Sequence, residues 1–275
     1  MKIRIFYIII LSFLCASADA QYAEQIQINS IDYFLMNNII FKDVYKKDNE
    51  LMKSSIKKVK ITDERNNILS ETNIDIEGRV TGYKSYPVNG QPQNIKAGYD
   101  IKNNLTGIVY RNTDGKILED IRLNYIGTAF FSYEKYENGN ELFEQCEMRY
   151  DNKKDKSLLT GFDSHLWQGD SIPYSVNFKY DIYNRLSDVR VTGDVTPLYE
   201  ISYSGDTIKI KSASGYEIYI VKDNIITRHI IHSEELNYTA SRIFTYDENG
   251  LVQFSSIEDM RGNKYRQNYI YDYFH

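Results

Sequence analysis

The chain has 275 residues, and its 33 Lys and Arg against 38 Asp and Glu give a formal net charge of −5. An acidic balance without a concentrated basic patch argues against a nucleic-acid partner, because contact with the phosphate backbone needs clustered cations. Tyrosine is frequent, with 25 residues against 12 Phe and 1 Trp, and proline is scarce at 4, a bias that favours paired β-strands with one packed face.

The first residues resemble a secretory leader. Lys2 and Arg4 precede an apolar stretch, and Ala-Asp-Ala at 18–20 supplies the small residues that a signal peptidase reads. The apolar stretch is shorter than the roughly 20 residues that span a bilayer. The residues before Cys15 fit a lipid-anchor signal poorly. We expect a signal peptide over 1–20 and an exported protein, located in the periplasm, in the outer membrane or outside the cell.

Beyond the leader, Cys146 is the one cysteine that remains, so the exported chain has no disulfide framework of its own. We interpret Cys146 as a small buried hydrophobic residue. The alternative, a nucleophile, needs a histidine base and an orienting partner, and the neighbouring sequence indicates neither.

Residues 21–60 are ambiguous and fit either a first strand with a short helix or two strands. From there on, apolar and polar residues alternate in short runs that end at turn clusters, which predicts strands of about 5–8 residues. Clear runs lie at 175–181, 199–205, 206–212, 215–223 and 264–275. We therefore expect one all-β domain over 21–275: an antiparallel β-meander of roughly 12–18 strands, forming a curved or partly rolled sheet.

An Asp recurs at the ends of these runs, three residues before a Gly or an Asn. The four pairs are Asp75 with Gly78, Asp100 with Asn103, Asp181 with Asn184, and Asp247 with Gly250. Gly and Asn tolerate positive φ, so each copy predicts a hairpin whose Asp carboxylate accepts backbone N–H bonds. These eight residues are expected to be structural turn residues. The copies are irregularly spaced, which argues against a solenoid.

Three of these copies, YDENGLV at 246–252, YDIYNRL at 180–186 and IDIEGRV at 74–80, resemble the tyrosine-aspartate repeats of the YD/RHS class. The chain looks most similar to small exported YD-like envelope proteins of this class. The resemblance implies an extended or rolled antiparallel sheet and carries over no catalytic residue, because the repeat has none. The chain departs from shell-forming members in its shorter length, its irregular spacing and its lack of a recognisable C-terminal toxin.

Two other segments hold residue types that carry chemistry. His229 and His232 lie in a run rich in β-branched residues that predicts a strand, where residues three apart face opposite sides and do not share a metal ion. Asp163, His165 and Trp167 lie in a stretch that we interpret as a polar loop. The aromatic ring makes these three a candidate ligand-binding set, for example for a sugar, against the simpler interpretation of a loop fixed by a buried Trp.

Two short patterns, Asp-Ser-Ile at 170–172 and Asp-Thr-Ile at 206–208, resemble O-glycosylation acceptors of some Gram-negative envelopes, which makes Ser171 and Thr207 candidate sites. No metal and no cofactor is expected. No second carboxylate is placed well enough by the sequence to argue glycosidase chemistry.

The function expected from these patterns is that of an exported, non-enzymatic envelope or secreted protein, a binding or scaffold module for an envelope protein or a glycan. The alternating aromatics of the C-terminal YIYDYFH keep a second candidate open, an outer-membrane β-barrel with membrane association. A carbohydrate-active enzyme is the third candidate.

Overall fold

The computed structural model describes residues 30–275 except 87–91, 128, 140, 152–157 and 169, and it leaves the side chains of 168 and 170–172 undescribed. The predicted signal peptide and its cleavage site therefore lie outside the described residues. The described part forms two helices, α2 (Ile31–Ile40) and α3 (Lys42–Met52), followed by an 18-stranded sheet.

Within the described residues the strands follow one another along the chain with no further helix between them. They are β1 (Ile56–Thr62), β2 (Ile68–Ile74), β3 (Val80–Ser85), β4 (Asn94–Tyr99), β5 (Leu105–Arg111), β6 (Ile117–Ile126), β7 (Ala129–Glu137), β8 (Glu141–Asp151), β9 (Leu158–Gln168), β10 (Asp170–Tyr180), β11 (Leu186–Val191), β12 (Tyr199–Ser204), β13 (Thr207–Ser212), β14 (Gly215–Lys222), β15 (Ile225–Ser233), β16 (Tyr238–Tyr246), β17 (Val252–Asp259) and β18 (Lys264–Tyr273).

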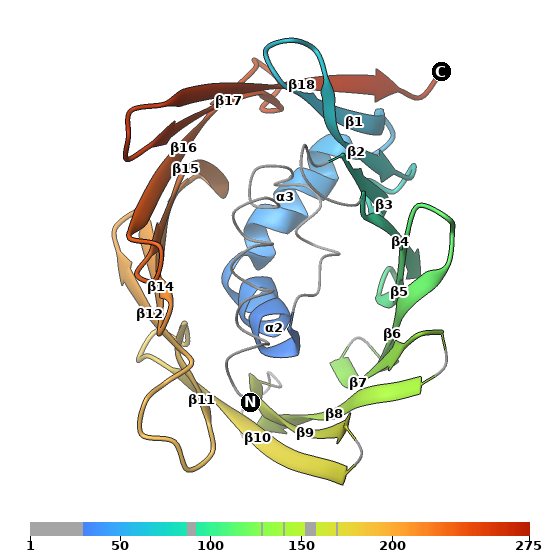
Figure 1. Cartoon of the computed structure of the whole chain (residues 1–275), viewed down its shortest axis with the longest axis vertical. Coiled ribbons are helices and arrows are strands. Elements are labelled where there is room, and N and C mark those ends of the chain that lie inside the picture. Colours follow the sequence, from blue (N-terminus) through green and yellow to red (C-terminus); the bar gives the residue numbers. More distant parts are fainter. Residues whose placement is uncertain (1–29, 87–91, 128, 140, 152–157, 169) are drawn as a thin grey trace.

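The sheet closes into a barrel. Each strand pairs antiparallel with the next one in the chain, and β1 pairs both with β2 and, from Ile56↔Tyr273 to Thr62↔Asn268, with β18. Figure 1 shows the resulting ring, which is longer than it is wide. The prediction of an all-β antiparallel meander is confirmed. The closure, which removes both sheet edges, goes beyond the predicted partial roll.

Both helices lie inside the ring (Figure 1). Helix α3 buries Val44, Tyr45, Asp48 and Met52 along one face, and α2 begins at the N-cap Ser30, whose Oγ accepts the Tyr33 N–H at 3.4 Å. The ambiguous segment before β1 is thus helical for two short stretches. The apolar residues of α2 do not keep to one helical face, because they meet the wall on several sides.

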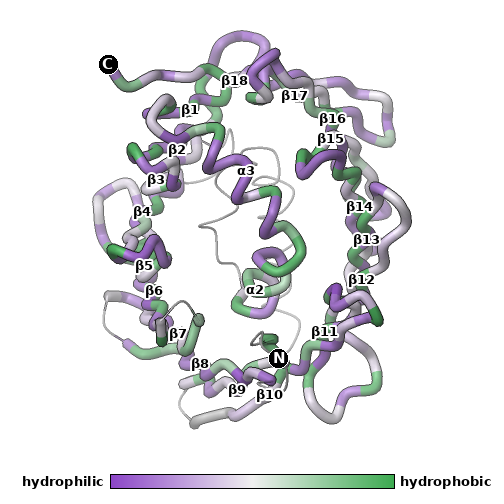
Figure 2. The backbone as a smooth tube through the Cα atoms, turned by 180° about the vertical axis from the view of Figure 1, so that it is seen from behind, coloured by the Kyte–Doolittle hydropathy of each residue, from purple (hydrophilic) through white to green (hydrophobic). Residues whose placement is uncertain are grey.

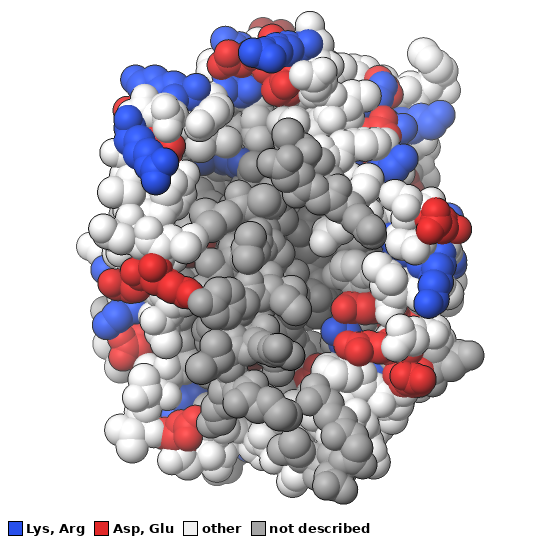
Figure 3. Space-filling model, viewed as in Figure 1, with Lys and Arg blue, Asp and Glu red and all other residues white. Residues whose placement is uncertain are grey.

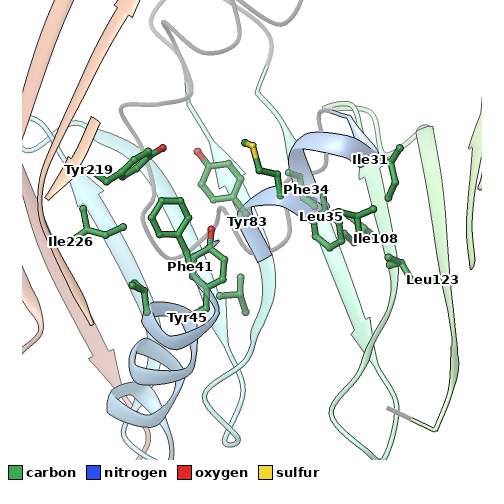
Figure 4. Close-up of a cluster of buried hydrophobic side chains, with 14 of the residues drawn as sticks. Ile31, Phe34, Leu35, Phe41, Tyr45, Tyr83, Ile108, Leu123, Tyr219 and Ile226 are labelled. Atoms are coloured by element: carbon green, nitrogen blue, oxygen red, sulfur yellow. The ribbon is translucent and has the colours of Figure 1, made fainter. Parts of the chain in front are cut away.

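The core is the inner face of the wall packed on these helices. In Figure 4, Phe34, Leu35 and Phe41 of the helical segment meet strand residues such as Tyr83 and Ile108. The Phe41 ring lies 4.6 Å from the ring of Tyr219 on β14. The buried apolar residues of the strands therefore belong to their inner face. Figure 2 shows that hydrophobic and hydrophilic residues are interspersed along the strands.

Candidate functional site

The four predicted Asp turns share one geometry. In each, Asp Oδ1 accepts the backbone N–H groups two and four residues ahead, at 2.8–3.0 Å. The residue three ahead has positive φ: 82° at Gly78, 66° at Asn103, 59° at Asn184 and 82° at Gly250. Bonds from its own turn, led by the Asn104 backbone N–H, hold the pKa of Asp100 below its usual range. In each of these carboxylates Oδ1 is occupied by the backbone of its own turn, and in Asp75, Asp100 and Asp181 a side chain binds Oδ2.

The aromatic residue before the Asp points inward and ties two strands together. The hydroxyls of Tyr99, Tyr180 and Tyr246 donate to the carbonyl oxygens of Val80, Leu159 and Ile226, each at the start of the preceding strand, at 2.9, 2.7 and 2.5 Å. A shift in register precedes each of these turns, for example between Thr245 and Tyr246. The recurrent pair is therefore a device for closing hairpins with a bulge.

Three further turns share this geometry. The sequence also predicts the hairpin at 112–118, with Asp114 and Gly115 at its tip, whereas the turns at Asp63 and Asp259 were missed. Asp63, Asn112 and Asp259 accept the backbone N–H four residues ahead at 2.8, 2.8 and 2.9 Å, and each precedes by three residues a positive-φ residue. None has an aromatic residue before it. The signal that finds them is the spacing between the acceptor and the following Gly or Asn.

The predicted ligand set lies on a strand and not in a loop. Asp163, His165 and Trp167 alternate along β9 with the buried Phe162 and Ser164, so all three point outward from the barrel. Trp167 is 47% exposed, which rules out the interpretation of a Trp buried beneath a loop. The prediction of a loop at 163–167 was wrong. Polar residues fill the outward positions of this strand, and small or polar residues follow Trp167 in the sequence, a composition that resembles a loop.

Asp163 is bound within the wall. Its Oδ1 accepts the Ser175 hydroxyl at 2.6 Å, and its Oδ2 lies 3.3 Å from Nε of Arg149. Arg149 also donates to the carbonyl of Val176 at 2.7 Å. Glycoside hydrolysis by Asp163 needs a second carboxylate at a defined distance, and the nearest one in sequence, Asp170, has a side chain outside the described part. What this surface offers is an exposed indole and imidazole on a rigid strand.

The two candidate glycosylation residues differ in what the structure describes. Thr207 starts β13 directly after the exposed tip at Gly205 and Asp206, and its backbone pairs with Ser204. Ser171 lies on β10 opposite Trp167, and its side chain is among those not described.

The two histidines of β15 face opposite sides of the wall. His229 points inward, where its Nε2 lies 2.8 Å from Oε2 of Glu217 and its ring stacks on Tyr219 at 4.1 Å. His232 points outward and pairs with Thr239 at 2.8 Å. Within the described residues no group of three His, Cys, Asp or Glu side chains is placed to hold a metal ion.

Glu217 also anchors the inner helix. Its carboxylate accepts the hydroxyls of Tyr219 at 2.6 Å and of Tyr33, on α2, at 3.3 Å. Burial by itself raises the pKa of Glu217, but the hydrogen bond and charge of His229 outweigh it, and the pKa lies below its usual range. The hydrogen bond from the Tyr33 hydroxyl to Glu217 ties α2 to the wall.

A second inner cluster surrounds Cys146. Glu144 accepts the hydroxyls of Tyr174 at 2.6 Å and Ser164 at 3.1 Å, and the Cys146 thiol lies 3.2 Å from the Ser164 hydroxyl. Burial raises the pKa of Glu144 and also that of the thiol. A raised thiol pKa disfavours the thiolate, so the group has the character of an inert buried cysteine.

Comparisons with known proteins assign no family. No family model matches the chain, and no curated protein matches it. Among solved structures, a porin-like protein from Bacteroides uniformis shows 13% identity and a TM-score of 0.41, covering 80% of this chain and 98% of that one. A chain of the TcdB2–TccC3–Cdc42 complex shows 11% identity and a TM-score of 0.33 over 77% of this chain and 16% of its own. Likenesses of this size assign no function.

Proposed function

We propose that this chain is an exported, non-enzymatic barrel of the cell envelope or the secreted space that binds a glycan or a protein partner on its outer wall. The single observation behind this proposal is the exposed Trp167, in line with His165 on a rigid, outward-facing strand. Indole rings stack on apolar sugar faces and anchor protein interfaces, and strands hold such groups more firmly than loops do.

The lumen is a poor place for a foreign ligand. The inner face of the wall is largely apolar apart from the Glu217 and Glu144 clusters, and it is packed against the chain's own helices, with Phe41, Met36 and Met52 at most 1% exposed. Buried bonds from Glu217 to Tyr33 add to that packing. Because the inside is occupied, the surface left for recognition is the outer wall and its turns.

The outer wall carries charge all around the barrel, as Figure 3 shows along the perimeter. Ion pairs on outward positions include Lys60 with Asp272 at 2.8 Å and Arg122 with Asp120 at 3.1 Å, and further pairs lie on β8–β9, β11 and β17–β18. On a lipid-facing strand each Arg or Lys near the bilayer midplane costs roughly 2–4 kcal/mol. A wall of this kind favours contact with water.

The outer-membrane barrel is the second candidate. An even number of antiparallel strands in one closed meander, seen here, is also the plan of bacterial outer-membrane barrels. The two described helices contain no segment long and apolar enough to cross a membrane. The two candidates differ in whether the outer face of the wall meets water or lipid, so the native chain's behaviour on extraction separates them.

The extraction test uses the full chain expressed in a Gram-negative host with its own leader. Release of the protein by sodium carbonate, or its recovery without detergent, is the expected result. Retention in the membrane pellet through carbonate washing, together with heat-modifiable migration on gels, would replace the first candidate with the outer-membrane barrel.

The binding test uses the only Trp of the chain as its own reporter. Titration with envelope glycans should change the fluorescence of Trp167, and Trp167→Ala should abolish binding measured by calorimetry. Tyr265→Ala, at a 55% exposed aromatic on β18, is the matched control and should leave binding unchanged. Binding that survives Trp167→Ala would remove this strand as the recognition surface.

A further inference from the structure

A notch opens at one end of the barrel wall, between two neighbouring hairpins. The ladder between β5 and β6 ends at Gly107↔Arg122, whereas β6 itself continues to Ile126. The β4–β5 turn meets the β6–β7 turn across this gap, where the Asn104 side-chain amide donates to the carbonyl oxygen of Gly127 at 3.3 Å. The notch has a volume of about 370 Å³, within the roughly 300–1,000 Å³ of small-molecule sites.

Polar side chains from both hairpins make up most of the lining. They are Asp100, Lys102, Thr106, Arg122, Asn124 and Tyr125. The fully exposed Ile101 stands at the lip. The carboxylate in the lining is already engaged, because Oδ1 of Asp100 accepts the backbone N–H groups of Lys102 and Asn104, and Oδ2 accepts the Asn104 side-chain amide, all at 2.8–2.9 Å. The charged groups that remain for a ligand are the two cations.

The two cations contribute in different ways. No carboxylate of the described residues lies within ion-pairing distance of the Lys102 ammonium, and a longer-range attraction links it to Asp100. The Arg122 guanidinium lies 4.3 Å from the centre of the Tyr136 ring, and Asp120 binds one of its nitrogens at 3.1 Å. Because Asp120 offsets part of the charge of Arg122, Lys102 supplies most of the attraction for an anion, while Arg122 supplies planar donors in a fixed position.

We propose that the notch binds an acidic sugar, a uronic acid at the end of a glycan or within it. Lys102 and Arg122 bind the carboxylate, because charge-assisted hydrogen bonds to a carboxylate are the strongest that these side chains make. Thr106, Asn124 and Tyr125 line the rest of the notch with polar side chains that suit the hydroxyls of the ring. The volume is far more than a free inorganic anion fills, which favours an anion carried on a ring.

This site is separate from the Trp167 strand. The β4–β5 and β6–β7 turns lie at one end of the antiparallel barrel, whereas Trp167 lies close to the end of β9 that meets β10, at the opposite end. An indole selects the apolar face of a sugar and not its charge. Neutral glycans therefore probe the Trp167 strand and uronic acids probe the notch, so the two proposals succeed or fail independently.

The experiment is calorimetric titration of the purified chain with digalacturonate, with maltose as the neutral probe of the same size. We expect digalacturonate to bind, to bind less tightly as salt rises, and to leave the fluorescence of Trp167 unchanged. Lys102→Ala should weaken its binding by roughly tenfold or more, the loss expected for one charge-assisted hydrogen bond. Lys102→Arg keeps the charge and should retain most of the affinity.

Lys116→Ala is the matched control, because Lys116 is an exposed lysine in a turn of the same geometry at the opposite end of the barrel. It should leave binding unchanged, and circular dichroism should show the parent fold in every variant. Absence of digalacturonate binding, or binding that Lys102→Ala leaves intact, would overturn the proposal. Maltose binding that Lys102→Ala weakens equally, or displacement of digalacturonate by an equal concentration of sodium acetate, would remove the acidic sugar as the ligand.

Discussion

Three turn glycines provide a matched test of where the inner helix sits. Gly78, Gly115 and Gly250 all have φ of +82°, and each closes a hairpin three residues after its acceptor side chain. They differ in what an added Cβ would meet. At Gly115 nothing lies within 4 Å, at Gly250 the tip of Leu51 lies at 3.7 Å, and at Gly78 the carbonyl oxygen of Asn49, in α3, lies at 2.1 Å.

The magnitudes follow from these distances. Alanine at a left-handed position costs roughly 1–2 kcal/mol, and this is the whole cost expected for Gly115→Ala and Gly250→Ala. At Gly78 the distance between the added Cβ and the carbonyl oxygen of Asn49 must grow by more than about 1 Å to reach van der Waals contact. The end of α3 must then move, which endangers the bond from Lys53 N–H to Asn49 O at 3.0 Å and that from Ser54 N–H to Ile76 O at 2.9 Å.

Loss of two backbone hydrogen bonds and of part of the packing around the fully buried Met52 adds roughly 2–4 kcal/mol. We therefore expect Gly78→Ala to lower the free energy of unfolding by about 3–6 kcal/mol, well beyond the two controls. The assay is urea unfolding followed by circular dichroism, with the slope of each transition compared. Equal losses at Gly78 and Gly115, within about 0.5 kcal/mol, would refute the seating of α3 on this turn.

Three further outcomes are expected. Asp247→Ala removes the acceptor for the Asn249 and Leu251 N–H groups. It should therefore lower the free energy of unfolding by about 1–2 kcal/mol and leave ligand binding unchanged. A loss of binding in a variant of unchanged stability would contradict a structural role. Burial raises the pKa of Glu144, so the folded state holds its proton to higher pH than the unfolded chain does, and stability falls as pH rises above the usual value of 4.5. Glu144→Gln should remove up to about 1.4 kcal/mol per pH unit of that slope, measured by unfolding at pH 5 to 8; an unchanged slope would contradict the assignment. Cys146 is fully buried with a raised thiol pKa, so it should react with a thiol reagent only after unfolding, and rapid labelling of the native chain would contradict its burial.

Local rules were enough to anticipate the strands and most of their turns. A strand alternates with period two, and a hairpin with a positive-φ residue needs Gly or Asn at one position, so both leave marks within a few residues. Asp247 and Gly250 carry such a mark. Asp63 has the same spacing to the positive-φ residue Asn66 but no aromatic residue before it. The acceptor side chain and the Gly or Asn three residues later are therefore the pattern that identifies such a turn.

Closure and contents of the barrel were beyond those rules. The pairing of β1 with β18 joins Ile56 to Tyr273, and no local pattern encodes a contact across that distance. The segment before β1 resisted assignment because its apolar residues face a wall on several sides and lose a clean helical face. From the sequence, a loop was predicted at Trp167. The outward side chains of this strand are polar, and a polar stretch is easily taken for a loop.

The position of the helices has a consequence for the order of assembly. They precede β1 in the chain, and the ladder between β1 and β18 is the one that seals the wall. Once eighteen hydrogen-bonded strands form a closed ring, a two-helix segment can enter only through an open end of the barrel or through an opened ladder. While the sheet is still open, the helical segment can pack directly on its inner face, and the growing wall then wraps around it.

Folding of this kind has a high contact order, because the sealing contact waits until the whole chain is present. Until then both edge strands and the apolar inner face are exposed to other chains. The N-terminal helical segment thus offers the later strands an apolar surface to pack on. A newly made molecule keeps two unpaired sheet edges, at β1 and at its most recent strand, until β18 has been made.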